Sequence, residues 1–551
     1  MRAIQFTRRP LTWFILLIVT TITVHGQSNQ SLQKFRRTQK AIPGQYIVVL
    51  NDSIARTDVA QTAQVLALTH GGQVRFTYEH AVKGFAIAIT EAAAKALSKN
   101  PNVEYVEEDS LGQVTQAQQF LSPGPNTFFG IDRINQVDLP LDNVYSYFGE
   151  GGAHVYILDT GTPIVTSSEF TILESGIVRA FVGFDTFGGN GLDFNNHGTA
   201  VAGIIGGRTF GVAKKALLVG VKVCDNNGNC PTSNVISGLN WVIANHQGSV
   251  VANMSLSGPP SSTLDTAVRN AMASSVLVVA AAGNNNSNAA NFSPARVLEA
   301  LTVGATLNND SRASYSNFGA VVDLYAPGGS LPSQGIPTVG TDGSVIGFDG
   351  TSAAAPHASG VAALYIRQTL GDPIATTYVV AGELKKRASF NKVTNLPVAG
   401  TRSLLYSLFS PESFVHTQGS VPFYRYYNGQ AGDHFYTTNF NELGPTSFGW
   451  DFEFIGFYVF PTQQGGTVPL YQYWNPQITD HFYTITFGTY SGYSFEKIAG
   501  YVYPSAGGLQ VPLYRYYNAQ LGDHFYTTNF SELGNGLYGW VFENIECYVS
   551  P

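Results

Sequence analysis

The sequence predicts an α/β fold with a parallel sheet at its centre, preceded by a small α+β unit and followed by an all-β domain. Three continuous apolar runs predict the sheet: LLVGVKV at 217–223, VVANMSLSG at 250–258 and SVLVVAAAGN at 275–284. Helical stretches such as SNVISGLNWVIANHQ separate these runs. This alternation is typical of parallel strands that helices cover on both faces. Reactive groups in such sheets gather at the carboxyl ends of the strands.

A compact block with its own pattern precedes this region, with a core at residues 41–110. It contains the strand-like segments QYIVVL, GFAIAIT and VEYVEED and the helix-like segment EAAAKALSKN. These segments predict the small α+β unit. The block is followed by a polar run, SLGQVTQAQQFLSPGPNT, which predicts an exposed linker.

Residues 421–551 contain three copies of one unit. The words VPFYRYYN, VPLYQYWN and VPLYRYYN begin at Val421, Val468 and Val511, so the copies are offset by 47 and 43 residues. Each copy is too small to bury its own aromatic side chains, so the copies are expected to share one core. We expect a pseudo-threefold all-β domain, joined to the rest by a linker at 411–420.

The overall composition excludes several classes of protein. Apolar residues make up 44% of the chain and charged residues 12%, and the net charge is −7. An acidic chain with few charges is not expected to bind nucleic acid. A basic start and an apolar run at 11–24 predict a signal peptide at 1–26. We expect a secreted monomer without a membrane anchor.

The chain has three cysteines. Cys224 and Cys230 lie six positions apart in an Asn- and Gly-rich loop, and in an oxidising compartment they are expected to form a disulfide. Two unpaired thiols are the alternative. Zinc is not expected, because no further cysteine or spaced histidine pair accompanies them. Cys547 is expected to be a buried apolar residue.

Four short motifs carry the chemistry. Asp159 ends the strand of LDTG, His197 stands at a helix start in NNHGTAVAG, and Ser352 does so in GTSAAAPH. A serine becomes a good nucleophile when a histidine takes its proton and a carboxylate orients that histidine. Asn284, after the strand in AAAGNNNS, is placed to donate to an oxyanion.

These motifs, in this order, resemble the subtilisin-like serine peptidases of family S8, most closely the proteinase K branch. The words AAGNNN, NFSPA, SYSNFG and APG support the resemblance, which covers about residues 41–410. It implies a peptidase domain at 119–410 that forms an acyl-enzyme, with Asp159, His197 and Ser352 as its triad and Asn284 in its oxyanion hole. The block before it resembles the I9-type inhibitor propeptide of that family. We place the propeptide at 27–118, with the cut between Asp109 and Phe120.

The resemblance also implies substrate and metal sites. The residues that would pair with the substrate main chain and line the pocket for the residue before the cut are Ser255, Leu256, Gly258, Ala281 and Gly283. No acidic residue stands there, so broad cleavage after apolar or aromatic residues is expected. No cofactor is needed for the chemistry. A structural calcium ion would be held by Asp323, Leu298 and Ala300, and a turn-capping role for Asp323 is an equal alternative.

Two residues depart from the family pattern. Ala200 and Ala353 stand where the family usually has histidine and methionine. Neither position carries a proton in the mechanism. A catalytically weak or inactive extracellular binding protein, which uses the peptidase domain as a scaffold, is the alternative function.

The word DHFYT recurs in the three repeats, at 433–437, 480–484 and 523–527. Its Asp-His pairs are compatible with a metal site, but the favoured interpretation is that each pair fixes a turn within its own repeat. The repeats resemble the DUF5648 units appended to secreted hydrolases. A carbohydrate or surface ligand is the expected partner of their aromatic residues, beside protein substrates for the peptidase domain.

Overall fold

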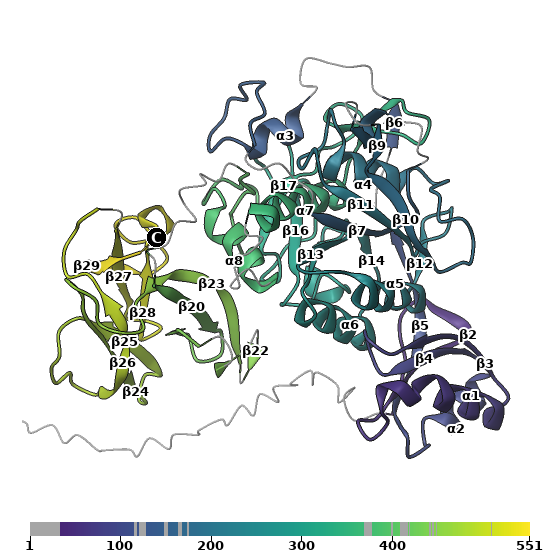
Figure 1. The fold of residues 1–551 in the computed structure, drawn as a ribbon, viewed down its shortest axis with the longest axis horizontal. Coiled ribbons are helices and arrows are strands. Elements are labelled where there is room, and N and C mark those ends of the chain that lie inside the picture. The colour runs from purple at the N-terminus through teal and green to yellow at the C-terminus, as the bar shows by residue number, and fades with distance from the viewer. Residues whose placement is uncertain are drawn as a thin grey trace, which may run out of the picture.

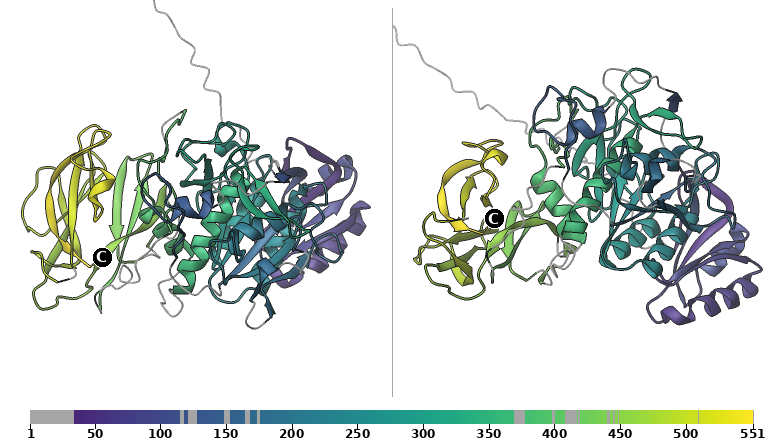
Figure 2. Two further views of the ribbon diagram at one scale, coloured as in Figure 1. Left: turned by 90° about the horizontal axis from the view of Figure 1, so that it is seen from above. Right: turned by 45° about the horizontal axis from the view of Figure 1, so that its top comes forward.

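The computed structural model contains three folded units. It describes residues 34–114, 118–120, 128–147, 153–163, 168–172, 176–368, 377–397, 400–407, 417, 419–439, 442–443, 446–447, 449–508 and 510–550. The predicted signal peptide and most of the predicted linker lie outside the described residues. The first unit and the C-terminal unit lie at opposite ends of the central one (Figure 1, Figure 2).

The first unit is the expected α+β block. Its strands are β1 (Phe35–Arg36), β2 (Ala41–Leu50), β3 (Gln73–Tyr78), β4 (Gly84–Ala88) and β5 (Val103–Val114), in the sheet order β1-β5-β2-β4-β3. The helices α1 (Val59–His70) and α2 (Glu91–Leu97) pack together and close a separate apolar core. Thr90 caps α2, because its side chain accepts a hydrogen bond from the N–H of Ala93.

The central unit is built on a seven-stranded parallel sheet, which confirms the predicted fold class. Its order is β10 (Ala180–Asp185), β11 (Leu217–Lys222), β7 (His154–Asp159), β13 (Val250–Met254), β15 (Val276–Ala281), β16 (Leu301–Thr306) and β17 (Leu324–Pro327). The helices are α3 (Phe129–Ile134), α4 (His197–Gly206), α5 (Thr232–Asn245), α6 (Ser262–Ala273), α7 (Thr351–Gln368) and α8 (Thr377–Arg387). Helix α4 packs on α7, and α5 packs on α6.

Short strands surround this sheet. They are β6 (Gln118–Phe120), β8 (Thr171–Ile172), β9 (Ile177–Val178), β12 (Asn229–Pro231), β14 (Leu256–Ser257), β18 (Ile336–Val339) and β19 (Val345–Phe348). In the described part of the chain, no helix combines the length and the apolar character that a membrane crossing needs. Cys224 and Cys230 form the expected disulfide, and Cys547 is buried with a free thiol.

The C-terminal unit is all-β, as predicted, and each repeat forms one antiparallel sheet. The strands are β20 (Val421–Asn428), β21 (Asp433–Thr437), β22 (Thr446–Ser447) and β23 (Trp450–Val459) in the first repeat, β24 (Val468–Asn475), β25 (Asp480–Thr484) and β26 (Ser494–Val502) in the second, and β27 (Val511–Asn518), β28 (Asp523–Thr527) and β29 (Val541–Val549) in the third. The three DHFYT strands contact one another around the pseudo-threefold axis. One apolar core is shared by all three repeats.

Hydrogen bonds close this ring of repeats. The hydroxyl of Tyr436 donates to the main-chain oxygen of Tyr526, that of Tyr526 to Tyr483, and that of Tyr483 to Tyr436, at 2.7–2.9 Å. The three tyrosines are at most 1% exposed. Each repeat therefore satisfies a buried phenol of a neighbour, which no single copy could do alone.

The Asp-His pairs also connect different repeats, so the predicted turn within each repeat is wrong. Nδ1 of His434 bonds to Asp523, that of His481 to Asp433, and that of His524 to Asp480, at 2.5–2.7 Å. The main-chain N–H of each histidine bonds to the same aspartate. The pseudo-threefold arrangement places the histidine of one copy closer to the aspartate of another than to its own.

Candidate active site

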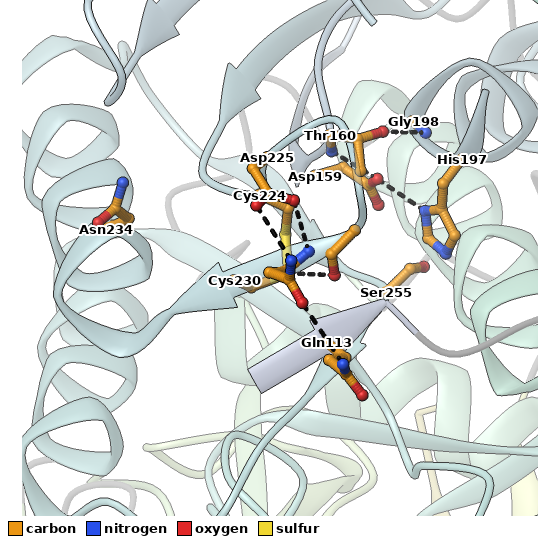
Figure 3. The surroundings of a disulfide bond; sticks show 12 residues. Gln113, Asp159, Thr160, His197, Gly198, Cys224, Asp225, Cys230, Asn234 and Ser255 are labelled. Carbon is orange, nitrogen blue, oxygen red and sulfur yellow. Dashed lines mark hydrogen bonds and ion pairs between the residues drawn. A yellow bond between two sulfur atoms is a disulfide. The ribbon is translucent and has the colours of Figure 1, made fainter. Parts of the chain in front are cut away.

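Asp159 and His197 form a buried hydrogen-bonded pair. Asp159 ends β7 and His197 begins α4, and both side chains are fully buried. His197 Nδ1 lies 2.7 Å from Asp159 Oδ1 (Figure 3). This contact fixes the proton of a neutral imidazole on Nδ1 and leaves Nε2 as an acceptor. Nε2 is buried and has no hydrogen-bond partner among the described residues.

A second aspartate, which the sequence reading missed, holds the start of α4 in place. Asp193 accepts hydrogen bonds from the N–H and the hydroxyl of Thr199, at 2.8 and 2.7 Å. It also accepts the hydroxyl of Thr160, which in turn accepts the N–H of Gly198. These contacts satisfy N–H groups that a helix start leaves unpaired. An aspartate just before a helical run was the signal that could have revealed it.

Ser352 lies at the second position of α7, which packs directly against α4. Its hydroxyl donates to the main-chain oxygen of Ser255 at 3.0 Å. Phe348, at the end of β19 just before this helix, contacts the ring of His197, with 5.3 Å between ring centroids. The starts of α4 and α7 are thus brought together at one end of the sheet.

The amide of Asn284 has a defined orientation beside the start of α7. Its Oδ1 accepts the N–H of Thr351 at 2.9 Å and the hydroxyl of Thr351 at 2.7 Å. An oxygen used in this way leaves Nδ2 as the donor on the other side of the amide. Thr351 therefore orients Asn284.

The first unit extends a strand into the cleft of the central unit. The end of β5 pairs with β14, where Val114 is opposite Leu256 and Gln113 is opposite Ser257. On its other edge β5 pairs with β12, where Gly112 is opposite Cys230. Figure 3 shows Gln113 beside Cys230, with Ser255 and His197 nearby. A chain held by antiparallel pairing on both edges has the arrangement of a bound peptide.

The other predicted substrate-binding residues have different places. Gly258 exchanges main-chain hydrogen bonds with Ser293, and its backbone lies against Gly112 of β5, because a Cβ on Gly258 would stand 3.1 Å from Gly112 Cα. Ala281 ends β15 inside the central sheet, opposite Val303. Gly283 has a φ of +98° and lies next to Ser257, because a Cβ on Gly283 would stand 3.2 Å from Ser257 Oγ.

The ammonium group of Lys385 lies beside the predicted calcium site. Asp323 Oδ2 accepts the N–H of Thr302 at 2.7 Å, and Oδ1 lies 3.5 Å from the ammonium of Lys385. Burial raises the pKa of Asp323, which Lys385 partly opposes. Leu298 is 51% exposed and Ala300 is buried. A fixed ammonium beside the only carboxylate of this set repels a divalent ion, so the residues present do not fit calcium well.

The sheet is parallel, the buried Asp-His pair lies on a strand and a helix that packs against the helix of Ser352, and a peptide-like strand pairs with the central unit on both edges. These features define the class of serine peptidases with an attached inhibitory segment. Comparisons with known proteins support this class. Residues 171–397 match the subtilase family, residues 45–114 match the peptidase inhibitor I9, and residues 405–490 and 486–550 match a domain of unknown function, DUF5648.

Relatives that match over the first two units are named proteinases or proteases. The chain is 40% identical over 395 residues to an extracellular serine proteinase of Thermus sp. strain Rt41A, covering 67% of this chain and 91% of that protein. It is 41% identical to alkaline serine exoprotease A of Vibrio alginolyticus, covering 61% and 60%, and 34% identical to proteinase R of Parengyodontium album, covering 66% and 89%. A solved cold-adapted subtilisin-like serine proteinase is 44% identical, with a TM-score of 0.47 over 52% of this chain and 100% of that one.

The chain belongs to the subtilase family. It is a serine endopeptidase whose I9 segment acts as an intramolecular inhibitor and whose substrates are peptides.

Proposed function

We propose that Ser352, His197 and Asp159 hydrolyse peptide bonds through an acyl-enzyme. The observation that carries this proposal is the 2.7 Å hydrogen bond of the buried Asp159–His197 pair, whose helix α4 packs against the helix that carries Ser352 in its first turn. The Ser352 hydroxyl exchanges its bond to Ser255 for one to His197 Nε2, which removes the proton as Oγ attacks the carbonyl carbon. His197 then gives this proton to the leaving amine, and water releases the acyl group by the same steps.

The negative charge of the tetrahedral intermediate needs donors. Asn284 Nδ2 and the main-chain N–H of Ser352 are the two groups proposed for this role. The orientation of Asn284 by Thr351 supports the first, and the position of Ser352 in the first turn of α7 supports the second. The side chain of Asp159 orients His197 and stabilises the imidazolium that forms in between.

Labelling tests this proposal. After removal of the first unit, a fluorophosphonate probe is expected to modify Ser352, and the adduct is located by peptide mass analysis. Ser352→Ala is expected to lose both label and hydrolysis, while Ser274→Ala, on the outer end of α6, keeps both. Absence of an adduct on Ser352 in the folded, processed protein would assign the chain to the alternative class, a non-catalytic binding protein.

The activation cut is proposed to fall between Val114 and Gln118, which narrows the predicted range of Asp109 to Phe120 and moves the start of the peptidase domain from 119 to 118 or earlier. Pairing of β5 with β14 ends at Val114, and pairing of β6 with β19 begins with Gln118 opposite Phe348. The chain is thus held by strand pairing on both sides of residues 115–117, which themselves lie outside the described residues. N-terminal sequencing of the processed protein is expected to give a start at 115–118. A start at 119 or later, or before 115, would contradict this assignment.

The residue accepted before the cut is the next part of the proposal. Its side chain is proposed to contact Ser257 of β14, which in this structure is opposite Gln113 of the first unit. Ser257 is 7% exposed, and its hydroxyl has no partner among the described residues. The preference for apolar or aromatic residues stays a prediction. We add that Ser257 favours side chains that can bond to a hydroxyl, because an aromatic ring would leave it buried and unpaired.

Secretion and an accessory role of the repeats complete the proposal. The basic and apolar start of the chain supports export, and extracellular relatives agree with it. The ligand of the repeats, predicted as a carbohydrate or a surface, is supported only by their partly exposed aromatic residues. Detection of the processed protein in the medium of expressing cells, and its loss when residues 1–26 are removed, is the expected result for secretion.

A further inference from the structure

The first repeat packs against the peptidase domain through its outer strand. Helix α8 lies on β23 (Figure 1). The contact is close at Gly382, where an added Cβ would stand 2.5 Å from the Cβ of Phe454 and 3.0 Å from the main-chain oxygen of Glu453. Phe452 packs against the apolar core that includes α8 residues. The interface therefore depends on a small helical residue at the crossing point.

Charged groups support this interface. Arg425 is 3% exposed and bonds to Glu453 at 2.6 Å and to Glu532 of the third repeat at 3.3 Å. Burial alone would raise the pKa of Glu453, but Arg425, His434 and Lys385 of α8 together hold it below its ordinary value. Lys385 of the helix thus contributes positive charge near Glu453 of the strand, while its own ion pair is with Asp323 of the peptidase domain.

The second and third repeats carry the same strand without a helix on it. Ile455 of the first repeat is fully buried, whereas Ile498 and Ile545 at the matching positions are 43% and 42% exposed. These three residues have the same register, opposite Tyr424, Tyr471 and Tyr514. The strands agree in sequence and pairing, so the difference in exposure comes from the neighbour that the first repeat has.

Aromatic rings widen each exposed surface. We define the outer face of the second repeat as Tyr471, Phe487, Phe495 and Ile498, and that of the third as Tyr514, Phe530, Phe542 and Ile545. Phe487 and Phe495 are 64% and 47% exposed, with ring centroids 5.5 Å apart. Phe530 is 37% exposed, and its ring centroid lies 5.0 Å from that of Tyr514. Adjacent exposed apolar side chains of this kind mark interaction surfaces.

We propose that these two outer faces bind a helix of a partner protein, one that resembles α8 in having a small residue at the crossing and a lysine three positions later. The first repeat supplies the template, because Gly382 and Lys385 have this spacing. Glu496 and Glu543 stand where Glu453 does, with side chains 37% and 33% exposed. Gln472 and Arg515 bond to them as Arg425 bonds to Glu453, so the negative charge is held at the same place in all three repeats. Lys497 and Asn544 replace Phe454, which gives the polar rim of a reversible interface.

The third repeat extends the existing interface. Glu532 bonds to Arg425, and the hydroxyl of Tyr538 lies 3.3 Å from Asn391 of the peptidase domain. Tyr538 is nevertheless 69% exposed. The outer face of the third repeat is therefore continuous with a contact that the chain already makes. This inference is independent of the peptidase activity, and the inactive Ser352→Ala chain can be used to test it.

The test uses a fluorescent peptide with the α8 sequence TYVVAGELKKR, stapled on the side of the helix opposite Gly382 because a short free helix is marginal in water. Fluorescence anisotropy with the full-length Ser352→Ala chain is expected to show saturable binding to two sites. Ile498→Glu together with Ile545→Glu is expected to weaken binding at least tenfold. Both isoleucines are exposed, so the melting temperature should stay unchanged.

Two controls separate a helix site from general adhesion. A peptide with leucine in place of the Gly382 position is expected to lose binding, because its side chain would enter the space of the strand. Leu68→Glu, which changes an 82% exposed apolar residue of the first unit, is expected to leave binding unchanged. No binding, or equal binding by the double variant, would overturn the proposal. Capture of chito-oligosaccharides in place of the peptide, lost in the double variant, would assign the faces to a carbohydrate and would overturn it too.

Discussion

The Ser257 hydroxyl provides the sharpest test of how the cleft selects its substrate. Ser257→Ala removes only the oxygen and keeps the Cβ. In the structure this oxygen is buried, has no partner among the described residues, and belongs to the strand that pairs with Gln113 of the first unit. A buried hydroxyl without a partner costs about 1–3 kcal/mol. An aromatic substrate side chain that covers it bears this cost, whereas a glutamine or threonine side chain avoids it by bonding to the hydroxyl.

The assay compares kcat/KM for two peptide p-nitroanilides that differ only in phenylalanine or glutamine before the cut. For Ser257→Ala, the Phe/Gln ratio of kcat/KM is expected to rise about 5- to 150-fold, which is the same 1–3 kcal/mol expressed as a rate ratio. Ser274→Ala is the matched control and should leave the ratio unchanged. A ratio within twofold of the wild-type value would refute the reasoning, since the hydroxyl would then not face the bound side chain.

Four further outcomes can be measured. Asn284→Ala is expected to lower kcat about 100- to 1,000-fold with little change in KM, and an equal change in both would contradict its oxyanion role. Burial raises the pKa of Asp109 to about 6 despite its bonds to Ser233, so the bound propeptide takes up a proton as the pH falls through 6. The affinity of the propeptide for the peptidase domain is therefore expected to rise about 100-fold from pH 7 to pH 4. Asp109→Asn should remove most of this pH dependence, and an unchanged pH dependence of affinity in this variant would assign the titration to another group. EGTA is expected to leave the melting temperature of the wild type unchanged. The Lys385→Ala variant is expected to melt at a lower temperature and to regain stability when Ca²⁺ is added. A lower melting temperature of the wild type in EGTA would favour the calcium site. A chain ending at 410 is expected to keep its turnover of small peptides but to melt at a lower temperature, because α8 loses its contact with β23.

Local patterns in the sequence were sufficient to predict the fold class. The apolar runs became strands of one parallel sheet, since runs without polar positions are stable only where both faces are covered. Asp159 ends β7, His197 begins α4 and Ser352 lies in the first turn of α7, as their local motifs predicted. The role of each followed from the chemistry of its residue type, which does not depend on distant parts of the chain.

Contacts between distant segments could not be predicted in this way. Asp193 was missed because its function depends on Thr160, which lies 33 positions away along the chain. The ion pair of Lys385 with Asp323 was not predicted, because Lys385 approaches Asp323 only through the packing of α8. Both cases concern a partner that arrives from another element, and local spacing carries no information about it.

The repeats separate the two contributions most clearly. The sequence by itself determined that three similar β units share one core, because the copies are alike and each is too small to bury its own aromatic residues. Only the tertiary structure decided that each Asp-His pair joins two repeats, and that one outer strand is covered by α8 while two remain exposed. Similar sequences have the same local preferences, but their neighbours differ once a single copy packs against another domain.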